Sequence, residues 1–226
     1  MIELSERLQM VASLVPKCEI VADVGTDHGY LSAWLLQNGI ASHVFATDIH
    51  AGPLARAKQT AAEYGLDEQM ELHLCDGLQF PQASTAQAVI LAGMGGETMI
   101  SILQAAAWSL HDTVLILQPQ SKLPILCDWL RDHGVALKEA KLCMDAGKRY
   151  LAFCAQGSEQ AETSVEELLF GSHDPLFPDY LDSEEQRLRF ALDGMRAASR
   201  DMKQDMDALM QRLEIINYYQ KAVKTW

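Results

Sequence analysis

The chain lacks long apolar runs, and its few cysteines form no recognisable pattern. No apolar stretch reaches the roughly 18 residues of a membrane span. The N-terminus does not have the charged-then-apolar layout of a secretory signal. The five cysteines are an odd number, are scattered, and include no C-x-x-C pair. We therefore expect a soluble, cytoplasmic protein with reduced thiols and no bound metal.

Basic residues are missing from one segment in particular. The net charge is -13, a balance that usually argues against a nucleic-acid partner. Residues 1–157 carry 10 Lys and Arg against 17 Asp and Glu, residues 158–186 carry none against 9, and residues 187–226 carry 8 against 5. The acidity is concentrated in a connector and the last segment is basic, so the total charge does not exclude a nucleic acid.

The first 157 residues have the alternating pattern of an α/β domain. An opening helix is predicted over 4–15, ending before Pro16. We then expect strands near 19–24, 43–48, 70–75, 87–92, 113–118, 135–143 and 149–155, with helices near 29–38, 52–64, 97–107 and 122–133 between the first five strands. This repetition predicts a Rossmann-like, doubly wound parallel sheet, and the last two strands predict an antiparallel edge hairpin.

The tail is predicted to be helical. From Leu188 to Val223, seam positions alternate steps of four and three residues, as in a coiled coil. Three arrangements could cover this seam. The tail could fold back on itself as an antiparallel helix pair broken near 198–201, it could form one long helix that rests on short pieces at 164–181, or it could pack against a second subunit. The unbroken phase through Ser199 favours the long helix, but a hairpin can also keep the phase, so the three alternatives stay open.

A glycine-bearing turn follows the first predicted strand. Its pattern is Asp23-x-Gly25-x-Asp27-x-Gly29, directly before a helical pattern. The glycines let the backbone pass close to a ligand over a helix N-terminus. A dinucleotide fingerprint would read G-x-G-x-x-G, whereas the carboxylate of Asp27 would repel a pyrophosphate and attract a cation.

Acidic residues end the next two strands. Asp48, 25 residues after Asp23 (48 - 23), is placed to accept ribose hydroxyls, or alternatively to cap the following helix. Asp76 is placed to accept a hydrogen bond from the exocyclic amine of an adenine, or alternatively to form an Asp-Gly turn. An adenosine ligand without pyrophosphate, with Asp23 or Asp27 facing a cationic group, fits S-adenosylmethionine better than NAD.

The fourth predicted strand is followed by Gly93-Met94-Gly95-Gly96. Methyltransferases that modify exocyclic amines carry an Asn- or Asp-Pro-Pro-aromatic motif here, and its absence indicates an acceptor that needs no such grip. A ring nitrogen with an in-plane lone pair can attack a methyl group directly. The alternative is a tight strand-to-helix turn with Met94 in the core.

Four further side chains near these turns have two interpretations each. His28 and Tyr30 follow the first turn and are either base-pocket or structural residues. Gln118 ends the fifth strand and either bonds a base edge or caps a loop. Arg7 either reaches the pocket or lies in solvent.

These motifs together resemble the bacterial tRNA adenine-22 N1-methyltransferase family. The resemblance rests on Leu4-Ser5-Glu6-Arg7-Leu8, Val21 to Tyr30, Gly52-Pro53-Leu54, Cys75-Asp76-Gly77-Leu78, Ala92 to Gly96, Leu115 to Pro119 and Gly147-Lys148-Arg149-Tyr150. The family usually has Asn at the position of Gln120. The resemblance implies a Rossmann-like domain that binds S-adenosylmethionine, a C-terminal coiled-coil domain that assists tRNA binding, and methylation of N1 of an adenine in the D-arm region.

We therefore predict a tRNA adenine N1-methyltransferase with a catalytic domain at 1–157 and a helical coiled-coil domain at 158–226. The predicted cofactor-binding residues are Asp23, Gly25, Thr26, Asp27, Gly29, Asp48, Ile49, Asp76, Gly77, Leu78, Ala92 and Gly93. The predicted catalytic residues, at the target base, are Asp27, His28, Tyr30, Met94 and Gln118. We expect a monomer or a weak homo-oligomer through the coiled coil. The rival functions are a small-molecule methyltransferase and a non-catalytic coiled-coil interaction protein.

Overall fold

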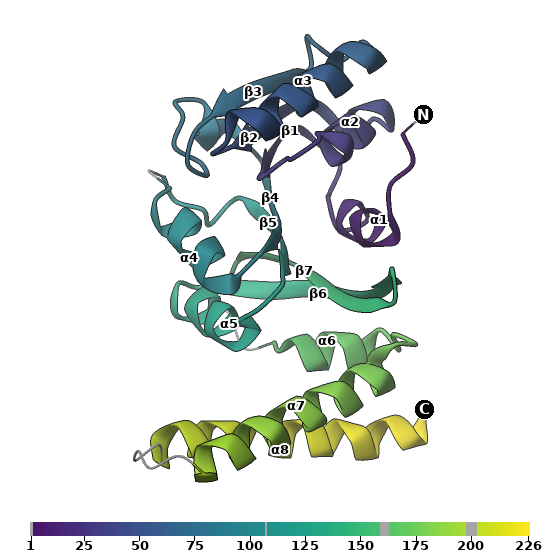
Figure 1. The fold of residues 1–226 in the computed structure, drawn as a ribbon, viewed down its shortest axis with the longest axis vertical. Helices are drawn as coiled ribbons and strands as arrows, with labels where there is room; N and C mark the ends of the chain where they lie inside the picture. The colour runs from purple at the N-terminus through teal and green to yellow at the C-terminus, as the bar shows by residue number, and fades with distance from the viewer. Residues whose placement is uncertain (1, 107, 159–162, 198–202) are drawn as a thin grey trace. The chain divides into compact units, whose positions relative to one another are not determined.

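The computed structural model describes residues 2–106, 108–158, 163–197 and 203–226 (Figure 1). Contacts between residues divide the chain into two compact units, Met1–Val165 and Glu166–Trp226. Within the described residues, no helix is long and apolar enough to cross a membrane.

The first unit is built on a seven-stranded sheet with the order β3-β2-β1-β4-β5-β7-β6. Its strands are β1 (Cys18–Val24), β2 (Ala41–Asp48), β3 (Met70–Leu74), β4 (Ala88–Met94), β5 (Val114–Pro119), β6 (Val135–Asp145) and β7 (Lys148–Gly157). The first five strands are parallel, and β7 runs antiparallel to both β5 and β6. The predicted Rossmann-like sheet with an antiparallel edge hairpin is confirmed.

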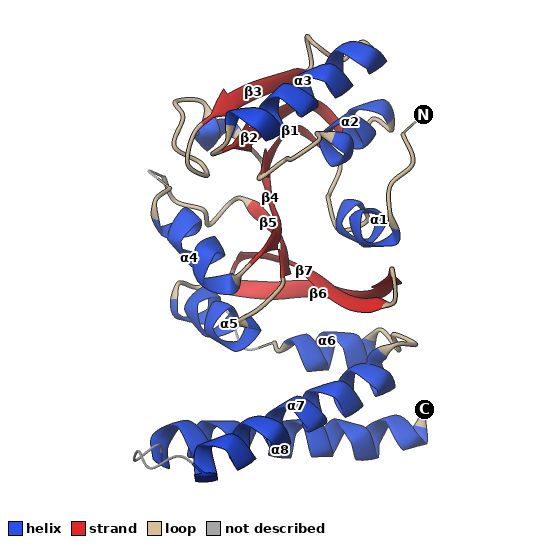
Figure 2. Cartoon of the chain, in the orientation of Figure 1, coloured by secondary structure: helices blue, strands red, loops and turns tan. Residues whose placement is uncertain are grey.

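Helices flank this sheet (Figure 2). They are α1 (Glu6–Ala12), α2 (Tyr30–Gln37), α3 (Ala51–Tyr64), α4 (Gly96–Gln104) and α5 (Leu123–Asp132), with a short 3-10 turn at Ala83–Thr85. The central strands are buried on both faces, which explains their near-continuous apolar runs: Val21, Val89 and Ile116 have no exposed surface. The opening helix begins later than predicted because Ser5 caps its start, its side chain accepting from the backbone N–H of Leu8, and it ends at Ala12, before the predicted end at 15.

The second unit contains α7 (Phe177–Ala197) and α8 (Lys203–Ala222), preceded by α6 (Val165–Gly171) and followed by a 3-10 turn at Val223–Thr225. The two long helices pack against each other. Gln220, near the end of α8, donates to Asp182 at 2.9 Å and to Glu185 at 2.8 Å, both near the start of α7. The antiparallel return is therefore correct and the single long helix is wrong. The predicted break at 198–201 lies outside the described residues.

The predicted seam lies inside this helix pair. Leu188, Leu192 and Ile216 are at most 4% exposed. Within the described residues every other seam position is half-buried: Met195, Met206, Leu209, Leu213, Gln220 and Val223. The seam is thus covered at least in part by the chain's own return helix.

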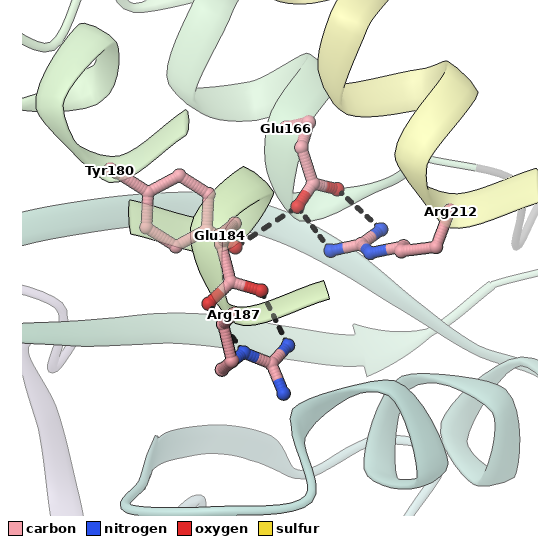
Figure 3. Close-up of polar contacts among 5 residues, drawn as sticks. All are labelled: Glu166, Tyr180, Glu184, Arg187 and Arg212. Carbon is pink, nitrogen blue, oxygen red and sulfur yellow. Dashed lines mark hydrogen bonds and ion pairs between the residues drawn. The ribbon is translucent and has the colours of Figure 1, made fainter. Parts of the chain in front are cut away.

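A buried ion pair connects the three helices of this unit (Figure 3). Glu166 of α6 is 1% exposed, and its two carboxylate oxygens accept from the guanidinium of Arg212 on α8. The Tyr180 hydroxyl of α7 donates to the same carboxylate at 3.0 Å. Burial, together with the carboxylate beside it, raises the pKa of Tyr180 well above its ordinary value. The buried carboxylate is therefore fully partnered, which is what its burial requires.

Candidate ligand site at the strand ends

The order of the sheet reverses between β1 and β4, and in sheets of this kind ligands bind beyond the carboxyl ends of the strands at such a reversal. The loops after β1, β2, β3, β4 and β5 all leave from this edge because these strands are parallel. The turn between β6 and β7 reaches the same edge, since β7 runs antiparallel to β5. The predicted site residues are thus brought to one edge of the sheet.

Asp23 holds the turn after β1 from inside the protein. It is 5% exposed, and its Oδ2 accepts from Ser32 Oγ at 2.6 Å and from Thr26 Oγ1 at 2.8 Å. Burial raises the pKa of Asp23, and the two hydroxyl hydrogen bonds oppose that rise. Thr26 is likewise buried. These two predicted cofactor-binding side chains therefore organise the turn and are not displayed on its surface.

Three residues of this turn have left-handed backbone conformations. Their φ angles are 75° at Gly25, 52° at Asp27 and 70° at Gly29. A Cβ on Gly25 would lie 3.2 Å from Met94 Cε, and a Cβ on Gly29 would lie 3.0 Å from Ala57 Cβ. The glycines therefore allow the turn to approach the tip of β4 and to pack on α3. Asp27 holds the conformation without being glycine, a mark of local strain.

Asp27 is exposed and already has a cationic partner. Its Oδ1 lies 2.6 Å from Arg56 Nη2 on α3 and 3.8 Å from His28 Nε2. The His28 ring stacks on Tyr30 at 5.3 Å with an interplanar angle of 7°. A cationic ligand at Asp27 must therefore share or replace Arg56, a residue that was not predicted because nothing in the spacing connects it to the first turn.

The tip of β2 carries a half-buried carboxylate beside an exposed apolar side chain. Asp48 Oδ1 accepts from the backbone N–H of His50 at 2.9 Å, and His50, not Asp48, is the N-cap residue of α3. The alternative that Asp48 caps the helix is therefore wrong. Ile49 is 60% exposed and lies free at the same edge.

The loop after β3 is fixed to β2 and borders a cavity. Thr47 Oγ1 donates to the carbonyl of Gly77 at 3.0 Å, and Leu78 is buried, so that residue can offer a ligand only its backbone. Asp76 is exposed and lines a cavity of about 320 Å³ together with Gln79, Glu97, Ser101 and neighbouring residues of α4. Asp76 thus faces a space that can take a ring-sized group.

The tip of β4 contains a bulge. The register with β5 shifts between Ala92 and Met94, and Gly93 between them has a φ of 81°. Gly96 serves packing: its N–H donates to the carbonyl of Ser121 at 2.9 Å, and a Cβ there would lie 2.7 Å from another backbone oxygen. The tight-turn alternative therefore explains Gly96, while Gly93 faces other side chains.

Gln118 and Arg7 meet beside this bulge. Gln118 has no exposed surface, and its Oε1 accepts from Arg7 Nη1 at 2.9 Å. A Cβ on Gly93 would lie 3.4 Å from the same Nη1 and 3.8 Å from Gln120 Nε2. Arg7 therefore reaches the ligand edge, as the first of its two interpretations proposed. The carboxamide oxygen of Gln118 is occupied by this bond, so the predicted contact with a base edge has a competitor within the chain.

The described residues include no group of three or more His, Cys, Asp or Glu that could hold a metal ion. This edge carries acidic side chains, left-handed glycines, a stacked aromatic pair and the held guanidinium groups of Arg7 and Arg56. These groups suit an organic ligand.

Comparison with known proteins agrees with a Rossmann-like methyltransferase as the class of this protein. The family model described as a methyltransferase domain matches residues 4–153. The tRNA (adenine(22)-N(1))-methyltransferase of Bacillus subtilis (strain 168) is 33% identical over 160 residues, which are 70% of this chain and 67% of that protein. This chain therefore belongs to the tRNA (adenine(22)-N(1))-methyltransferase family.

Solved structures agree over nearly the whole chain. The crystal structure of the Bacillus subtilis tRNA methyltransferase TrmK matches with a TM-score of 0.82 and 28% identity, covering 97% of this chain and 100% of that one. A Streptococcus pneumoniae candidate tRNA (m1A22) methyltransferase, crystallised with S-adenosyl-L-methionine, matches with a TM-score of 0.81 and 28% identity, covering 96% of this chain and 100% of that one. The likeness thus includes the C-terminal helices.

Proposed function

We propose that this protein uses S-adenosylmethionine to methylate N1 of adenine 22 in tRNA. The observation that carries the proposal is the edge formed by β1 to β4. Acidic side chains follow three neighbouring strands there, and the tip of β4 lacks a motif for gripping an amine. The activity of the Bacillus subtilis relative supports the same reaction.

The residues at this edge fit S-adenosylmethionine. Asp48 and Asp76 stand at the ends of β2 and β3, where a ribose and an adenine amine need acceptors. The cavity beside Asp76 offers room for the adenine ring. The exposed carboxylate of Asp27 would attract the cationic part of the cofactor, which would share or replace Arg56 there. When bound, the cofactor supplies a methyl group activated by a sulfonium.

The chain's own residues act by positioning the acceptor. Adenine N1 has an in-plane lone pair that can attack the methyl group in line, so a covalent step through a cysteine is unnecessary. The stacked His28 and Tyr30 rings offer an aromatic surface for the base, since the Tyr30 side chain is 45% exposed. Met94, whose Cε would lie 3.2 Å from a Cβ on Gly25, brings an apolar thioether close to the turn after β1.

The proposal is tested by methyl transfer to tRNA followed by mapping of the modified base. Wild-type protein should place one methyl group on adenine 22, and a tRNA with guanine at that position should remain unmodified. Methylation of N6 instead of N1, or failure with tRNA together with methylation of a small molecule, would overturn the assignment.

Asp27→Asn tests the site itself. The neutral side chain should lower both cofactor affinity and turnover, by about 10-fold or more, because it removes the only exposed carboxylate of the first turn. Isothermal titration of the cofactor and initial methylation rates measure the two effects. Unchanged affinity and unchanged turnover would remove Asp27 from the site.

We also infer that the C-terminal helices assist tRNA binding, that the protein is a monomer or weak homo-oligomer, and that it acts in the cytoplasm, where tRNA is modified. Three arginines of α7 are paired with acids of the same helix: Arg187 with Glu184, Arg189 with Glu185 and Arg196 with Asp193. Arg200 lies outside the described residues. The positive charge available to RNA is therefore smaller than the composition suggests.

The role of these arginines is tested by replacing Arg187, Arg189, Arg196 and Arg200 with glutamine. The variant should bind tRNA more weakly and should keep the wild-type affinity for the cofactor, measured by titration. Unchanged tRNA affinity would exclude this face of the helical unit from the RNA interface.

A further inference from the structure

Arg7 is the cation that α1 brings to the ligand edge of the sheet. Its Nη1 donates to Gln118 Oε1 at 2.9 Å, and its Cζ lies 5.7 Å from the centre of the Tyr150 ring. The same Nη1 would lie 3.4 Å from a Cβ on Gly93. The guanidinium is thus held over the tip of β4, next to the position where amine-methylating enzymes carry their acceptor-gripping side chain.

The charge of Arg7 has no carboxylate partner among the described residues. Arg56, Arg131 and Arg212 each form an ion pair with an acid, whereas no ion pair involves the guanidinium of Arg7. The nearby acid Asp145 accepts instead from the backbone N–H of Arg7, at 3.3 Å. A guanidinium has five N–H donors, and at Arg7 only one nitrogen has a partner within the described chain.

A half-buried guanidinium that is held in place and lacks a counterion is suited to an anion with matching geometry. The anion that RNA offers is the phosphate. Adenine gains a positive charge on methylation at N1, and an unpaired Arg7 guanidinium beside the base would repel that charge. A phosphate bound to Arg7 would cancel the repulsion. We infer that Arg7 binds the RNA phosphate beside the target adenine, an inference that rests on the proposed function.

Gln118 then acts as a positioning residue for Arg7. Its side chain is wholly buried, and its oxygen fixes one arm of the guanidinium, which lowers the entropy lost when a phosphate binds. Tyr150 supports the flat face of the same group. These two contacts account for a buried amide at the end of a strand whose other residues are apolar.

The test compares Arg7→Gln and Arg7→Lys with wild type in direct tRNA binding at several salt concentrations. Arg7→Gln should weaken tRNA binding by roughly 10-fold. It should also reduce the slope of log K against log salt by about 1, because one phosphate contact is lost. Arg7→Lys should keep the wild-type slope with a smaller loss of affinity, since lysine keeps the charge and loses the fork.

Cofactor affinity should stay at the wild-type value in Arg7→Gln. The melting temperature should fall, because the buried Gln118 oxygen loses its donor, so tRNA binding is compared well below it and the salt slope separates the phosphate contact from a structural role. Arg131→Gln is the matched control. Arg131 lies at the end of α5, near the start of β6, and so on the side of the sheet away from the carboxyl ends of the parallel strands. The Arg131→Gln variant should bind tRNA as wild type does.

Three results would overturn the inference: unchanged tRNA affinity in Arg7→Gln, weaker binding with an unchanged salt slope, or a loss explained by weaker cofactor binding. The proposed function fails separately. It fails if wild-type protein does not methylate tRNA, whereas a wild-type enzyme that methylates tRNA beside an Arg7→Gln variant that binds normally refutes the role of Arg7 alone.

Discussion

Gly77 occupies a backbone conformation that is costly for other residues, and its neighbour leaves no room for a side chain. Its φ is 60°, and a Cβ there would lie 2.7 Å from Ile102 Cγ2. Gly77→Ala should therefore lower the free energy of unfolding by about 2–4 kcal/mol, combining backbone strain with a steric clash. Urea denaturation followed by circular dichroism measures the loss.

Gly65→Ala is the control for this prediction. Gly65 has a φ of 66°, and a Cβ at this position would meet nothing within 4 Å, so its substitution isolates the backbone term. That term should be about 1–2 kcal/mol. If the two variants lose equal stability, Ile102 accommodates the methyl group and the close contact at Gly77 has no energetic weight.

His73 should make the protein less stable at mildly acidic pH. Its ring stacks on Phe80 at 4.1 Å, and burial lowers its pKa, although Glu71 partly offsets the effect. Below the ordinary histidine value of about 6.5, the unfolded chain binds a proton that the folded protein resists. Stability is therefore present above that pH and is lost as pH falls through it.

The measurement is the free energy of unfolding of wild type and His73→Phe between pH 5 and 8. As the pH falls, the free energy of unfolding of wild type should decrease more than that of the variant, because phenylalanine keeps the stack on Phe80 and cannot be protonated. Parallel pH profiles would show that His73 titrates equally in both states.

The candidate site residues whose place in the fold the sequence predicts well are those that follow strands. Asp48 and Asp76 could be placed because parallel strands bring their carboxyl ends to one edge. Contacts between separate elements could not be placed. Arg56 lies 29 positions from its partner Asp27, and Arg7 lies 111 positions from Gln118. No periodicity carries information about such pairs, since they depend on how the helices pack on the sheet.

At the scale of elements, the C-terminal helices depend on one buried carboxylate. Arg212→Met would leave Glu166 charged at 1% exposure with no cation beside it and only the Tyr180 hydrogen bond, at a cost of about 3–5 kcal/mol. Hydrogen exchange in the α8 peptides should accelerate by roughly 100- to 4,000-fold, since each 1.4 kcal/mol is about tenfold. Mass spectrometry of the peptides measures the rate.

Arg187→Met is the matched control in the same unit. Arg187 pairs with Glu184 at 2.5 Å, and their side chains are 58% and 17% exposed, so solvent screens this pair more than it screens Arg212 and Glu166, at 21% and 1%. Exchange in the same peptides should change little. An equal acceleration in both variants would mean that the loss reflects helix propensity or general charge, and not the burial of Glu166.

The elements themselves were largely predictable from the sequence, with one failure that has a physical reason. Strands that are buried on both faces, such as β4, give apolar runs that mark their bounds. The heptad phase across the tail did not distinguish a long helix from a hairpin. Both arrangements bury the same stripe, and the seam of α7 continues in phase into α8.

At the scale of the whole molecule, the ligand edge belongs to one of the two compact units. All predicted site residues lie between Asp23 and Gln118, within the unit Met1–Val165. Cofactor at about 100 times its dissociation constant should stabilise that unit by up to ~2.7 kcal/mol. Hydrogen exchange should therefore slow in the β1 and β4 peptides and stay unchanged in the α8 peptides. Equal protection of both units would show that they unfold together.

The place of β7 between β5 and β6 has a consequence for synthesis on the ribosome. The last strand of the sheet to be synthesised, β7, is an inner strand. The outermost strand on that side, β6, is synthesised before it. The tight turn between Asp145 and Lys148 lets these two strands pair locally before they dock. The sheet, and with it the ligand edge at the carboxyl ends of its parallel strands, therefore stays incomplete until residue 157 has left the ribosome. A nascent chain that stalls earlier exposes the unpaired side of β5 to chaperones and to other chains.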